Sequence, residues 1–388
     1  MPTTNQPDGF ALSIERAPLL AALKRTLKAV ERRNTIPILS NALLRADGDT
    51  LTVTGTDLDI EVTARVPAAV SGGGALTVPL TPLEAIVSKF EANNTVSLNY
   101  DEKTGRLVVK SGRSKFQFGT LPASDFPELT GAHHGEPGAF RLTLAGKVLA
   151  DMISRCAFAI SNEETRYYLN GIYTHVVTID GEPTLRFVAT TGHQLARIDS
   201  THAQGLDPLM PGIIIPRKAV AIFGALGADT GDGDVELIVT RSKIRASAGT
   251  TSIVSKLIDG TFPDYQRVIP TQFQNEARAP TLALIEALGR VATLSGEKVR
   301  GVKLQFSENL LGITLRNHDI ESEASDELDI EFEGTPFEIG FNSRYLAEIL
   351  DHSGSDVTTL HLGADNTAPI VIGDRLAEGL YVLMPLRI

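Results

Sequence analysis

The sequence predicts an α+β protein in which one helix-and-strand unit is repeated three times along the chain. Two kinds of amphipathic helical pattern carry this prediction. Each kind recurs at intervals of roughly 130 residues, the length of a small domain rather than of a solenoid repeat. Strand pairs with turn-forming residues between them follow the helical patterns. Three such units with long antiparallel sheets indicate a curved assembly whose wall is made of sheet.

The first helix lies within residues 15–41, and its pattern has one apolar face and one basic face. At a helical period the apolar face carries Leu19, Leu20, Leu23, Leu27 and Val30. The opposite face carries Lys24, Arg25, Lys28 and Arg32, with no acid among them. Pro18 suits a first helical turn, and Asn34 with the Ile36-Pro37 pair is expected to end the helix. We therefore expect a packed helix that shows positive charge to something outside the protein.

Further helices of this first kind are expected within residues 140–160 and 278–295. Their apolar faces carry Val148, Leu149, Met152, Ile153 and Cys156 in the former segment, and Leu284, Ile285, Leu288, Val291 and Ala292 in the latter. Helices of the second kind each follow a short apolar strand that ends in Pro or Asn, within residues 76–90, 213–227 and 337–353. Hairpin turns are expected at 103–105, near Ser242 and around 365–366, and a last strand within 380–388.

Two polar segments rich in turn-forming residues separate the three units. They span residues 129–138 and 270–280, and such composition is typical of domain boundaries. The expected domains are therefore an N-terminal one over residues 1–133, a central one over 134–268 and a C-terminal one over 269–388. A length of 388 residues also favours two or three domains over one.

Composition bounds the class of protein. An apolar content of 42% is ample for real cores. The single cysteine, Cys156, excludes an intramolecular disulfide framework and favours a reducing cytosol. The segment MPTTNQPDGF has no signal-peptide pattern, and no apolar run is long enough to span a bilayer. A net charge of −11 argues against a protein that coats nucleic acid with its whole surface, but it leaves room for a local basic patch.

Charge is unevenly distributed between the first and third units. Within residues 103–115 the charged residues are all basic, namely Lys103, Arg106, Lys110, Arg113 and Lys115. Within residues 319–338 the charged residues are all acidic, namely Asp319, Glu321, Glu323, Asp326, Glu327, Asp329, Glu331, Glu333 and Glu338. These runs are either two solvated strand faces or two edges that meet, within one chain or head to tail between chains that close into a ring.

The sequence shows no pattern of residues that indicates an active site. His193 in Gly-His-Gln-Leu has no nucleophile elbow to serve, and the sequence contains no P-loop, no GxGxxG after a strand and no HExxH. Asp229, Asp232 and Asp234 lack the order of a calcium loop and indicate a polar hairpin turn. Asp57 and Asp59 are expected on one strand face, as an acid pair, as metal ligands, or as acids that face solvent or accept backbone hydrogen bonds. We expect no catalytic residue, no metal and no cofactor.

Arg166, Tyr167 and Tyr168 form a separate group beside a turn. Two aromatic rings and an arginine suit stacking on nucleic acid, and they equally suit packing between domains.

A resemblance to a known family runs almost from end to end. ERRNTIPILSNALL, TGTDLDIEV, SGRSKF, TLPASDFPEL, RYYLNGIY, ATTGHQLAR, IIPRKAV, SKLIDGTFPDYQRVIP and YVLMPLRI are similar to segments of the bacterial DNA polymerase III beta subunit family, the replicative sliding clamps. The resemblance implies three clamp domains per chain in a head-to-tail homodimeric ring, with helices lining the hole and sheets forming the outer wall. It also implies a non-catalytic processivity factor that encircles duplex DNA.

The resemblance further implies three sets of functional residues. A pocket for short peptides of polymerases, the clamp loader and repair proteins matches Arg166, Leu169, Thr190, Gly192, His193, Leu195, Pro263, Tyr265, Arg267, Val268, Pro369, Val382, Met384 and Pro385. Residues expected at DNA are Lys24, Arg25, Lys28, Arg32, Arg33, Arg166, Tyr167 and Tyr168. Those expected at the dimer contact are Lys110, Arg113, Lys115, Phe116, Phe118, Leu294, Glu321, Glu323 and Asp326.

Two features depart from the resemblance, and two other classes of protein compete with it. Glu163 and Glu164 put acids where relatives can place uncharged residues near DNA, and MPTTNQPD has no counterpart in shorter relatives.

A small-molecule or metal-dependent hydrolase on repeated α+β domains would require a clustered site of acids or nucleophiles. A sequence-specific DNA-binding protein would bind linear DNA tightly. For a clamp, we expect duplex DNA, a second copy, polymerases and the clamp loader as partners, no membrane, and a cytoplasmic, nucleoid-associated location.

Overall fold

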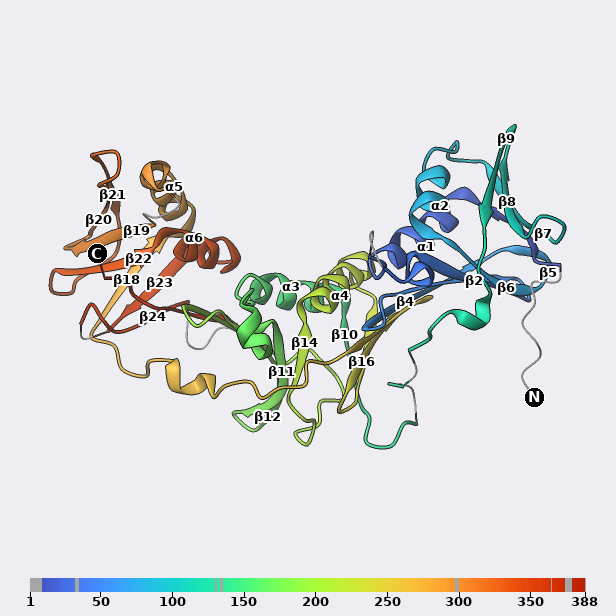
Figure 1. The fold of residues 1–388 in the computed structure, drawn as a ribbon. Coiled ribbons are helices and arrows are strands. Elements are labelled where there is room, and N and C mark those ends of the chain that lie inside the picture. The colour runs from blue at the N-terminus through green and yellow to red at the C-terminus, as the bar shows by residue number, and fades with distance from the viewer. Residues whose placement is uncertain are drawn as a thin grey trace. The chain divides into compact units, whose positions relative to one another are not determined.

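The computed structural model describes residues 9–31, 35–129, 131–132, 135–296, 300–363, 365–373 and 379–387. Its contacts divide the chain into two compact units, Met1–Thr143 with Asp232–Leu257, and Leu144–Gly231 with Ile258–Ile388. Each unit is described by itself (Figure 1). Within the described part of the chain, no helix is both long enough and apolar enough to cross a membrane.

The described residues of the first unit form two antiparallel sheets and two α-helices. The helices are α1 (Arg16–Leu27) and α2 (Leu80–Val87). One sheet has the order β5-β1-β7-β8-β9, with β5 (Ala69–Gly72), β1 (Ala11–Glu15), β7 (Thr95–Asp101), β8 (Arg106–Ser111) and β9 (Ser114–Gly119). The other has the order β10-β15-β16-β17-β4-β3-β2-β6, with β10 (Phe140–Ala145), β15 (Asp234–Val239), β16 (Lys243–Ala248), β17 (Thr251–Lys256), β4 (Ile60–Pro67), β3 (Thr50–Thr56), β2 (Asn41–Asp47) and β6 (Gly74–Pro79).

In the second unit, the part of the chain that the structure describes also forms two antiparallel sheets, together with four α-helices. The helices are α3 (Gly146–Ala157), α4 (Arg217–Thr230), α5 (Thr281–Val291) and α6 (Ser343–His352). One sheet has the order β14-β11-β12-β13-β25-β24-β23-β18, with β14 (Ile213–Pro216), β11 (Gly171–Ile179), β12 (Glu182–Thr190), β13 (Gln194–Ser200), β25 (Gly379–Leu383), β24 (Ile370–Ile372), β23 (Val357–Leu362) and β18 (Asn275–Pro280). The other has the order β21-β20-β19-β22, with β21 (Ser322–Asp329), β20 (Leu310–Asn317), β19 (Gly301–Ser307) and β22 (Phe337–Asn342).

The predicted threefold repeat of helix, strands, helix and strands is confirmed. Each repeat contributes a pair of helices that pack against each other: α1 with α2, α3 with α4, and α5 with α6 (Figure 1). In the central pair, Gly146 and Gly227 let the backbones approach closely, because a Cβ built on either glycine would lie about 2.5 Å from the other's carbonyl oxygen. The strands that precede α2, α4 and α6 end in Pro79, Pro216 and Asn342, as predicted.

The structure adds strands that the sequence patterns did not predict and shortens one helix. Strands β1, β10 and β18 precede the first helix of each repeat. Helix α1 ends at Leu27 rather than at Asn34, because the backbone tightens there, with the N–H of Ala29 bonded to the carbonyl of Thr26. Gly55 of β3 packs against that same carbonyl. Val30 is still buried, but it lies beyond the helix. Residues 32–34 and 1–8 lie outside the described residues.

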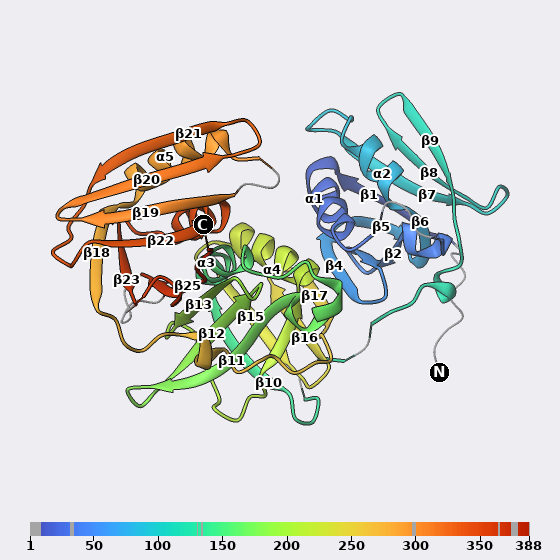
Figure 2. The ribbon, with the colours of Figure 1, turned by 60° about the vertical axis from the view of Figure 1, so that its left-hand side comes forward.

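Two sheets continue from one repeat into the next. In the first unit, β17 of the central repeat pairs antiparallel with β4 of the N-terminal repeat, from Thr251↔Ala64 to Ser255↔Ile60. In the second unit, β25 of the C-terminal repeat pairs antiparallel with β13 of the central repeat, from Gln194↔Leu383 to Ile198↔Gly379. By contrast, β9 and β21 each lie at the edge of their sheet, with one neighbouring strand (Figure 2). Two junctions between repeats are therefore formed by strand pairing within the chain. In the described part of the chain, β9 and β21 each keep one edge without a strand partner, and we call them the open edge strands.

Candidate functional site

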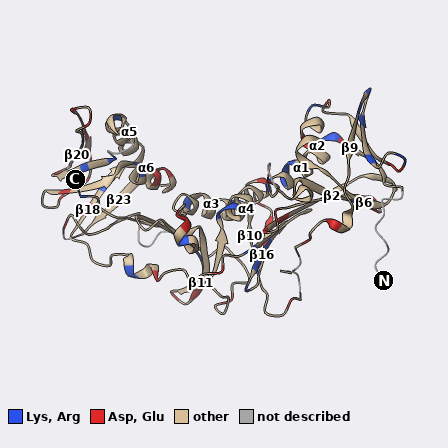
Figure 3. Cartoon of the chain, in the orientation of Figure 1, with Lys and Arg blue, Asp and Glu red and all other residues tan. Residues whose placement is uncertain are grey.

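Basic side chains gather on α1 and around β9, both in the first unit (Figure 3). Leu19 and Leu23 of α1 are fully buried, whereas Lys24 and the C-capping Lys28 are exposed. Arg25 reaches Thr251 Oγ1 at 3.4 Å. This confirms the predicted burial of one helix face. Arg32 and Arg33, also expected at DNA, lie outside the described residues.

The group around Arg166 divides between two environments. Tyr167 is 53% exposed, as a surface contact requires. Tyr168 instead lies partly buried against a core cluster that includes Leu169 and Phe262. Arg166 lies within the 3₁₀ segment Glu164–Leu169, and its Nε pairs with Glu163 at 3.1 Å. The charge of Glu163 is thus matched inside the chain, while Glu164 is exposed.

The open edge strands carry opposite charge. On β9 every side chain except Phe118 is exposed, and Lys115 lies directly opposite Lys110 of β8. Two like charges at such positions repel each other. Phe116 is 37% exposed and packs against Phe90 at a ring distance of 5.9 Å, whereas Phe118 belongs to the core of its own domain.

On β21 the exposed positions alternate with half-buried ones, and acids occupy three of the four exposed positions. Glu323 pairs with Arg316 at 2.9 Å, and the half-buried Asp326 pairs with Arg290 at 2.6 Å. The hydrogen bond from Arg290 lowers the pKa of Asp326. Glu321 lies in the turn before β21 with a φ of 46°, and Leu294 is half-buried.

A pocket of about 300 Å³ lies in the second unit, where β13 meets β25. Its lining residues are Arg166, Tyr168, Leu169, Thr190, Gly192, His193, Gln194, Leu195, Pro263, Asp264, Tyr265, Val268, Val382 and Met384. They come from the 3₁₀ segment before β11, the β12–β13 turn, the segment after β17 and the end of β25. The exposed lining is mostly apolar, which suits a pocket that takes up apolar side chains.

Hydrogen bonds fix the β12–β13 turn at the pocket. The hydroxyl of Thr190 donates to the carbonyl of Gln194 at 2.8 Å and accepts from the N–H of Gly192 at 3.0 Å. Gly192 has a φ of 90°, a conformation that glycine adopts without strain. The N–H of Met384 donates to the carbonyl of His193 at 2.9 Å, so the chain after β25 is fastened to the same turn.

Most of the residues that the resemblance assigned to a pocket lie together. Arg267, Pro369 and Pro385 are outside the lining, and Arg267 instead pairs with Asp264 at 3.0 Å on the surface. Sequence reasoning missed Gln194 and Asp264, and it assigned Tyr168 to DNA or to packing between domains but not to the pocket. All three are chain neighbours of predicted pocket residues, so adjacency was the available signal.

The pocket holds no arrangement for covalent or metal chemistry. The ring of His193 stacks on Tyr345 at 6.1 Å, and that of Tyr345 is the one ring contact His193 makes among the described residues. Cys156 is fully buried, and burial raises the pKa of its thiol, which makes it a poor nucleophile. The described residues include no group of three or more His, Cys, Asp or Glu side chains that could hold a metal ion.

The acidic loops that the sequence singled out are structural. Asp57 and Asp59 lie in the turn between β3 and β4, not on a strand face as expected. Asp57 accepts from the N–H groups of Asp59 and Ile60, and Asp59 pairs with Lys256 at 3.0 Å. The segment with Asp229, Asp232 and Asp234 connects α4 to β15 through Gly231, so it is a helix–strand connection rather than a hairpin turn.

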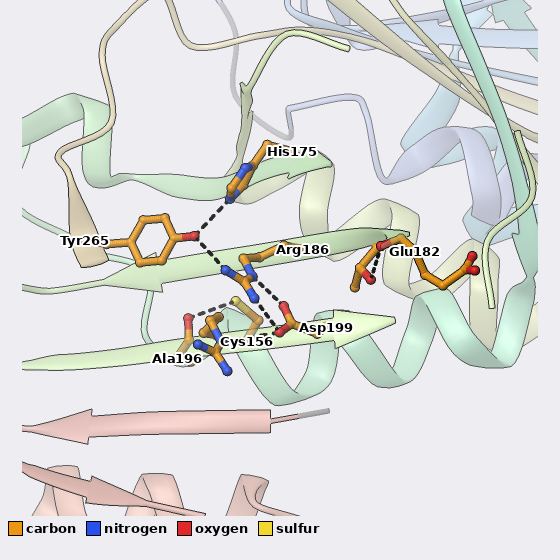
Figure 4. A network of polar contacts seen from close by, with 9 residues as sticks. Cys156, His175, Glu182, Arg186, Ala196, Asp199 and Tyr265 are labelled. Carbon is orange, nitrogen blue, oxygen red and sulfur yellow. Dashed lines mark hydrogen bonds and ion pairs between the residues drawn. The ribbon is translucent and has the colours of Figure 1, made fainter. Parts of the chain in front are cut away.

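A buried polar network lies behind the pocket (Figure 4). Arg186 binds both carboxylate oxygens of Asp199, through Nε at 2.6 Å and Nη2 at 2.8 Å. Its Nη1 donates to the hydroxyl of Tyr265 at 3.2 Å, and that hydroxyl also contacts Nε2 of His175 at 3.1 Å. His175, Arg186 and Asp199 are register partners on β11, β12 and β13, so the sheet itself sets their spacing.

This network predicts a loss of stability in acid. Burial first, and then the charge of Arg186, lower the pKa of His175 from 6.5 to about 4, while Asp199 acts in the opposite sense. Below pH 6.5 the unfolded chain therefore takes up a proton that the folded one refuses, so stability falls as the pH falls towards 4 and levels off below it. Urea unfolding midpoints between pH 7.5 and 4.5 are expected to fall less in His175→Gln. An equal fall in both proteins would contradict this assignment.

Comparisons with known proteins agree over the whole chain. Residues 10–130, 143–264 and 266–387 match the N-terminal, central and C-terminal domains of the DNA polymerase III beta subunit. A beta sliding clamp of Caulobacter vibrioides is 42% identical over 97% of this chain and 100% of the relative. That of Escherichia coli is 35% identical over 97% and 99%.

Solved structures give the same result. A clamp from C. crescentus superimposes with a TM-score of 0.92 at 40% identity, over 98% of this chain and 99% of that one. A clamp from Bartonella birtlesii, bound to griselimycin, has a TM-score of 0.92 at 41% identity, over 98% and 100%.

The three repeats with their paired helices and antiparallel sheets therefore define a DNA clamp, a non-catalytic processivity factor rather than an enzyme. The chain belongs to the DNA polymerase III beta subunit family. The alternative of a hydrolase finds no support in these matches.

Proposed function

We propose that two copies of this chain join head to tail into a ring that encircles duplex DNA and tethers replication proteins to it through the pocket of the second unit. One observation carries the proposal. The same kind of strand pairing joins the N-terminal repeat to the central one and the central repeat to the C-terminal one. The corresponding strands at the two ends of the series, β9 and β21, are edge strands.

The correspondence follows from strand order in each repeat. The third strand after the first helix is β4, β13 or β21, and the third strand after the second helix is β9, β17 or β25. Within the chain, β4 pairs with β17 and β13 pairs with β25. The remaining pair is β21 with β9, both of which are edge strands. We infer that β21 of one chain pairs with β9 of its partner, which covers two strand edges that would otherwise invite aggregation.

Charge supports this pairing. Lys110 and Lys115 repel each other on the β9 side, together with the exposed Arg113, and acids line β21. An acidic partner edge would relieve the repulsion and favour the correct orientation. Phe116 and Leu294 supply partly exposed apolar surface for the centre of the contact, whereas Phe118 acts from within its own core.

The basic surface of α1 suits contact with DNA phosphates. Lys24, Arg25 and Lys28 lie on one side of the helix, and the resemblance adds Arg32, Arg33, Arg166 and Tyr167. Such contacts carry no base information, so binding is independent of sequence and weakens with salt. A ring needs only weak contacts of this kind, because topology holds it on DNA, and a net charge of −11 limits adhesion elsewhere.

The pocket suits short linear peptides of polymerases, the clamp loader and repair proteins. It combines apolar walls with a flexible Met384 and a few polar groups that fix register. Griselimycin, which is bound to the related Bartonella clamp, is a second expected ligand. Because a clamp acts on chromosomal DNA, the location that we propose is the cytoplasm, at the nucleoid.

Replacing Met384 by alanine is expected to weaken a polymerase-derived clamp-binding peptide about tenfold and to leave dimerisation unchanged. Met384 is partly exposed in the pocket lining, so its loss removes contact area for the ligand rather than core packing. Fluorescence anisotropy gives the peptide affinity, and sedimentation gives the oligomer. Leu209→Ala is the matched control, because Leu209 is an exposed apolar residue outside the lining. Unchanged peptide affinity in Met384→Ala would remove the pocket assignment.

The proposal as a whole is tested on circular DNA. The protein is loaded onto a nicked circle by the clamp loader of its own organism, washed in high salt, and the circle is then cut. We expect retention on the circle and release on cutting, because only a topological link survives salt and depends on closure of the DNA. Release by salt alone would show ordinary electrostatic binding and would refute the ring.

A further inference from the structure

The wall of the pocket that contains Tyr265 has little backbone support of its own. Tyr265 begins the 3₁₀ segment Tyr265–Val268, in the connection between β17 and β18. From 259 to 273, the backbone hydrogen bonds outside regular elements that the structure shows are local ones, Arg267 N–H to Asp264 and Ile269 N–H to Gln266. No strand pairs with this stretch. Its position must therefore come mainly from side chains.

Tyr265 supplies such a side-chain link. It is one of the residues that line the pocket, yet it is only 5% exposed, and its hydroxyl points towards Arg186 and His175 (Figure 4). Arg186 and Asp199 are also well buried, with side chains 9% and 11% exposed. Their bidentate ion pair is fixed by adjacent strands and offers an anchor of defined geometry.

The donor and acceptor groups of Arg186, Tyr265 and His175 restrict where the protons of this network lie. Arginine only donates, so the oxygen of Tyr265 accepts from Nη1 of Arg186. The hydroxyl has one proton of its own, and Nε2 of His175, 3.1 Å away, accepts it when the ring proton is on Nδ1. Because the pKa of His175 is lowered to about 4, its imidazole is neutral near pH 7 and has one nitrogen that can accept. The hydroxyl thus has two polar partners, Arg186 and His175, which fix its direction.

Aromatic contacts also hold the Tyr265 ring. His175 stacks on Tyr173 at 4.7 Å, and Tyr173 stacks on Phe262 at 4.9 Å with the two planes 5° apart. Tyr265 stands edge-on to both Tyr173 and His175. The connecting segment is therefore held at Phe262 by stacking and at Tyr265 by edge-on ring contacts and hydrogen bonds.

We propose that the buried Arg186–Asp199 pair, with His175, positions the Tyr265 ring and so pre-forms the wall of the peptide pocket that lies on the connecting segment. The inference rests on the proposed peptide-binding role of this pocket and adds residues that lie outside its lining. Arg186, Asp199 and His175 are positioning residues, and they act on the ligand only through the hydroxyl of Tyr265. Pre-forming a binding wall raises affinity because less ordering is needed on binding.

A double-mutant cycle on the full chain tests this coupling. Tyr265→Phe keeps the ring and removes the hydroxyl, and Arg186→Lys keeps the positive charge beside Asp199 but loses the fork. A labelled polymerase-derived clamp-binding peptide is titrated against each protein by fluorescence anisotropy. We expect each single change to weaken binding about three- to tenfold, the factor that one such hydrogen bond contributes. The double variant is expected to bind no more weakly than the weaker single variant, because both changes break the same link.

A matched control and a second variant keep the test decisive. Tyr173 stacks on His175 and Phe262, and its hydroxyl makes no hydrogen bond in the described part of the chain. Tyr173→Phe removes this hydroxyl and is expected to change peptide affinity less than twofold. If Arg186→Lys fails to fold, His175→Leu replaces it in the cycle, and His175→Gln is expected to regain affinity because glutamine can accept the hydroxyl proton. Thermal unfolding in parallel confirms that every variant is folded at the assay temperature.

The outcomes separate this inference from the proposed function. Additive losses in the cycle, or a Tyr265→Phe variant that binds as tightly as the natural protein, would overturn the positioning role while leaving the peptide pocket in place. A natural protein that binds neither the peptide nor griselimycin would remove the proposed pocket function and this inference with it.

Discussion

Reversing the charge of both Arg113 and Lys115 to glutamate is expected to dissociate the proposed dimer at concentrations where the natural protein stays paired. Both side chains are exposed on or beside the open edge strand β9. Against an acidic β21, attraction becomes like-charge repulsion, which costs several kcal/mol across an interface. A loss of about 2–4 kcal/mol raises the dissociation constant roughly 30- to 1,000-fold. Sedimentation equilibrium across protein concentration measures this shift.

A control and a rescue variant make this result specific. Arg65→Glu with Arg241→Glu changes the net charge equally at exposed positions away from both edge strands, and no change in dissociation is expected. Adding Glu321→Lys and Glu323→Lys to the disrupted protein restores opposite charges at the contact and is expected to recover most of the dimer. Dissociation that stays unchanged in the Arg113→Glu, Lys115→Glu protein would show that β9 is not the contact.

Of the substitutions proposed for this protein, the one that removes the carboxylate of Asp199 is expected to lower the free energy of unfolding most. In Asp199→Ala, the guanidinium of Arg186 stays buried without its bidentate partner, and an uncompensated buried charge costs about 3–5 kcal/mol of the free energy of unfolding. Urea unfolding followed by circular dichroism gives the shift of the midpoint.

An exposed pair in the same unit provides the comparison. Nη1 of Arg278 and a carboxylate oxygen of Glu331 are 3.6 Å apart, and the two side chains are 53% and 77% exposed. Water and salt screen such a pair, so Glu331→Ala is expected to cost less than about 1 kcal/mol. Equal losses in Asp199→Ala and Glu331→Ala would show that the buried pair is not under the constraint assigned to it.

Local pattern in the sequence predicted much of the fold. The apolar stripe of α1 placed Leu19 and Leu23 in the core, and the strands that end in Pro79, Pro216 and Asn342 marked the start of three helices. These signals work because helix and strand periods are properties of neighbouring residues. The same locality explains the errors. The end of α1 depends on packing of Gly55 against Thr26, and the position of Asp59 depends on a turn and on Lys256.

The candidate site was predicted by resemblance and not by chemistry. No motif in the sequence marks the pocket, because its walls come from four separate segments and consist largely of ordinary apolar side chains. Tyr168 shows the limit clearly. Beside Arg166 and Tyr167 its residue type suited nucleic acid, but the backbone turns its ring into the pocket wall and the core.

By itself, the sequence determined the threefold repeat, the two helices in each repeat, the basic face of α1, the opposite charges of the first and third units, and the lack of an enzymatic motif. Only the tertiary structure decided which strands join the repeats, that β9 and β21 stay open, and that Tyr265 reaches Arg186. The physical reason is range. Periodicity and composition record contacts between near neighbours, whereas strand pairing such as β17 with β4 and a buried pair such as Arg186 with Asp199 depend on register between segments, which no local pattern specifies.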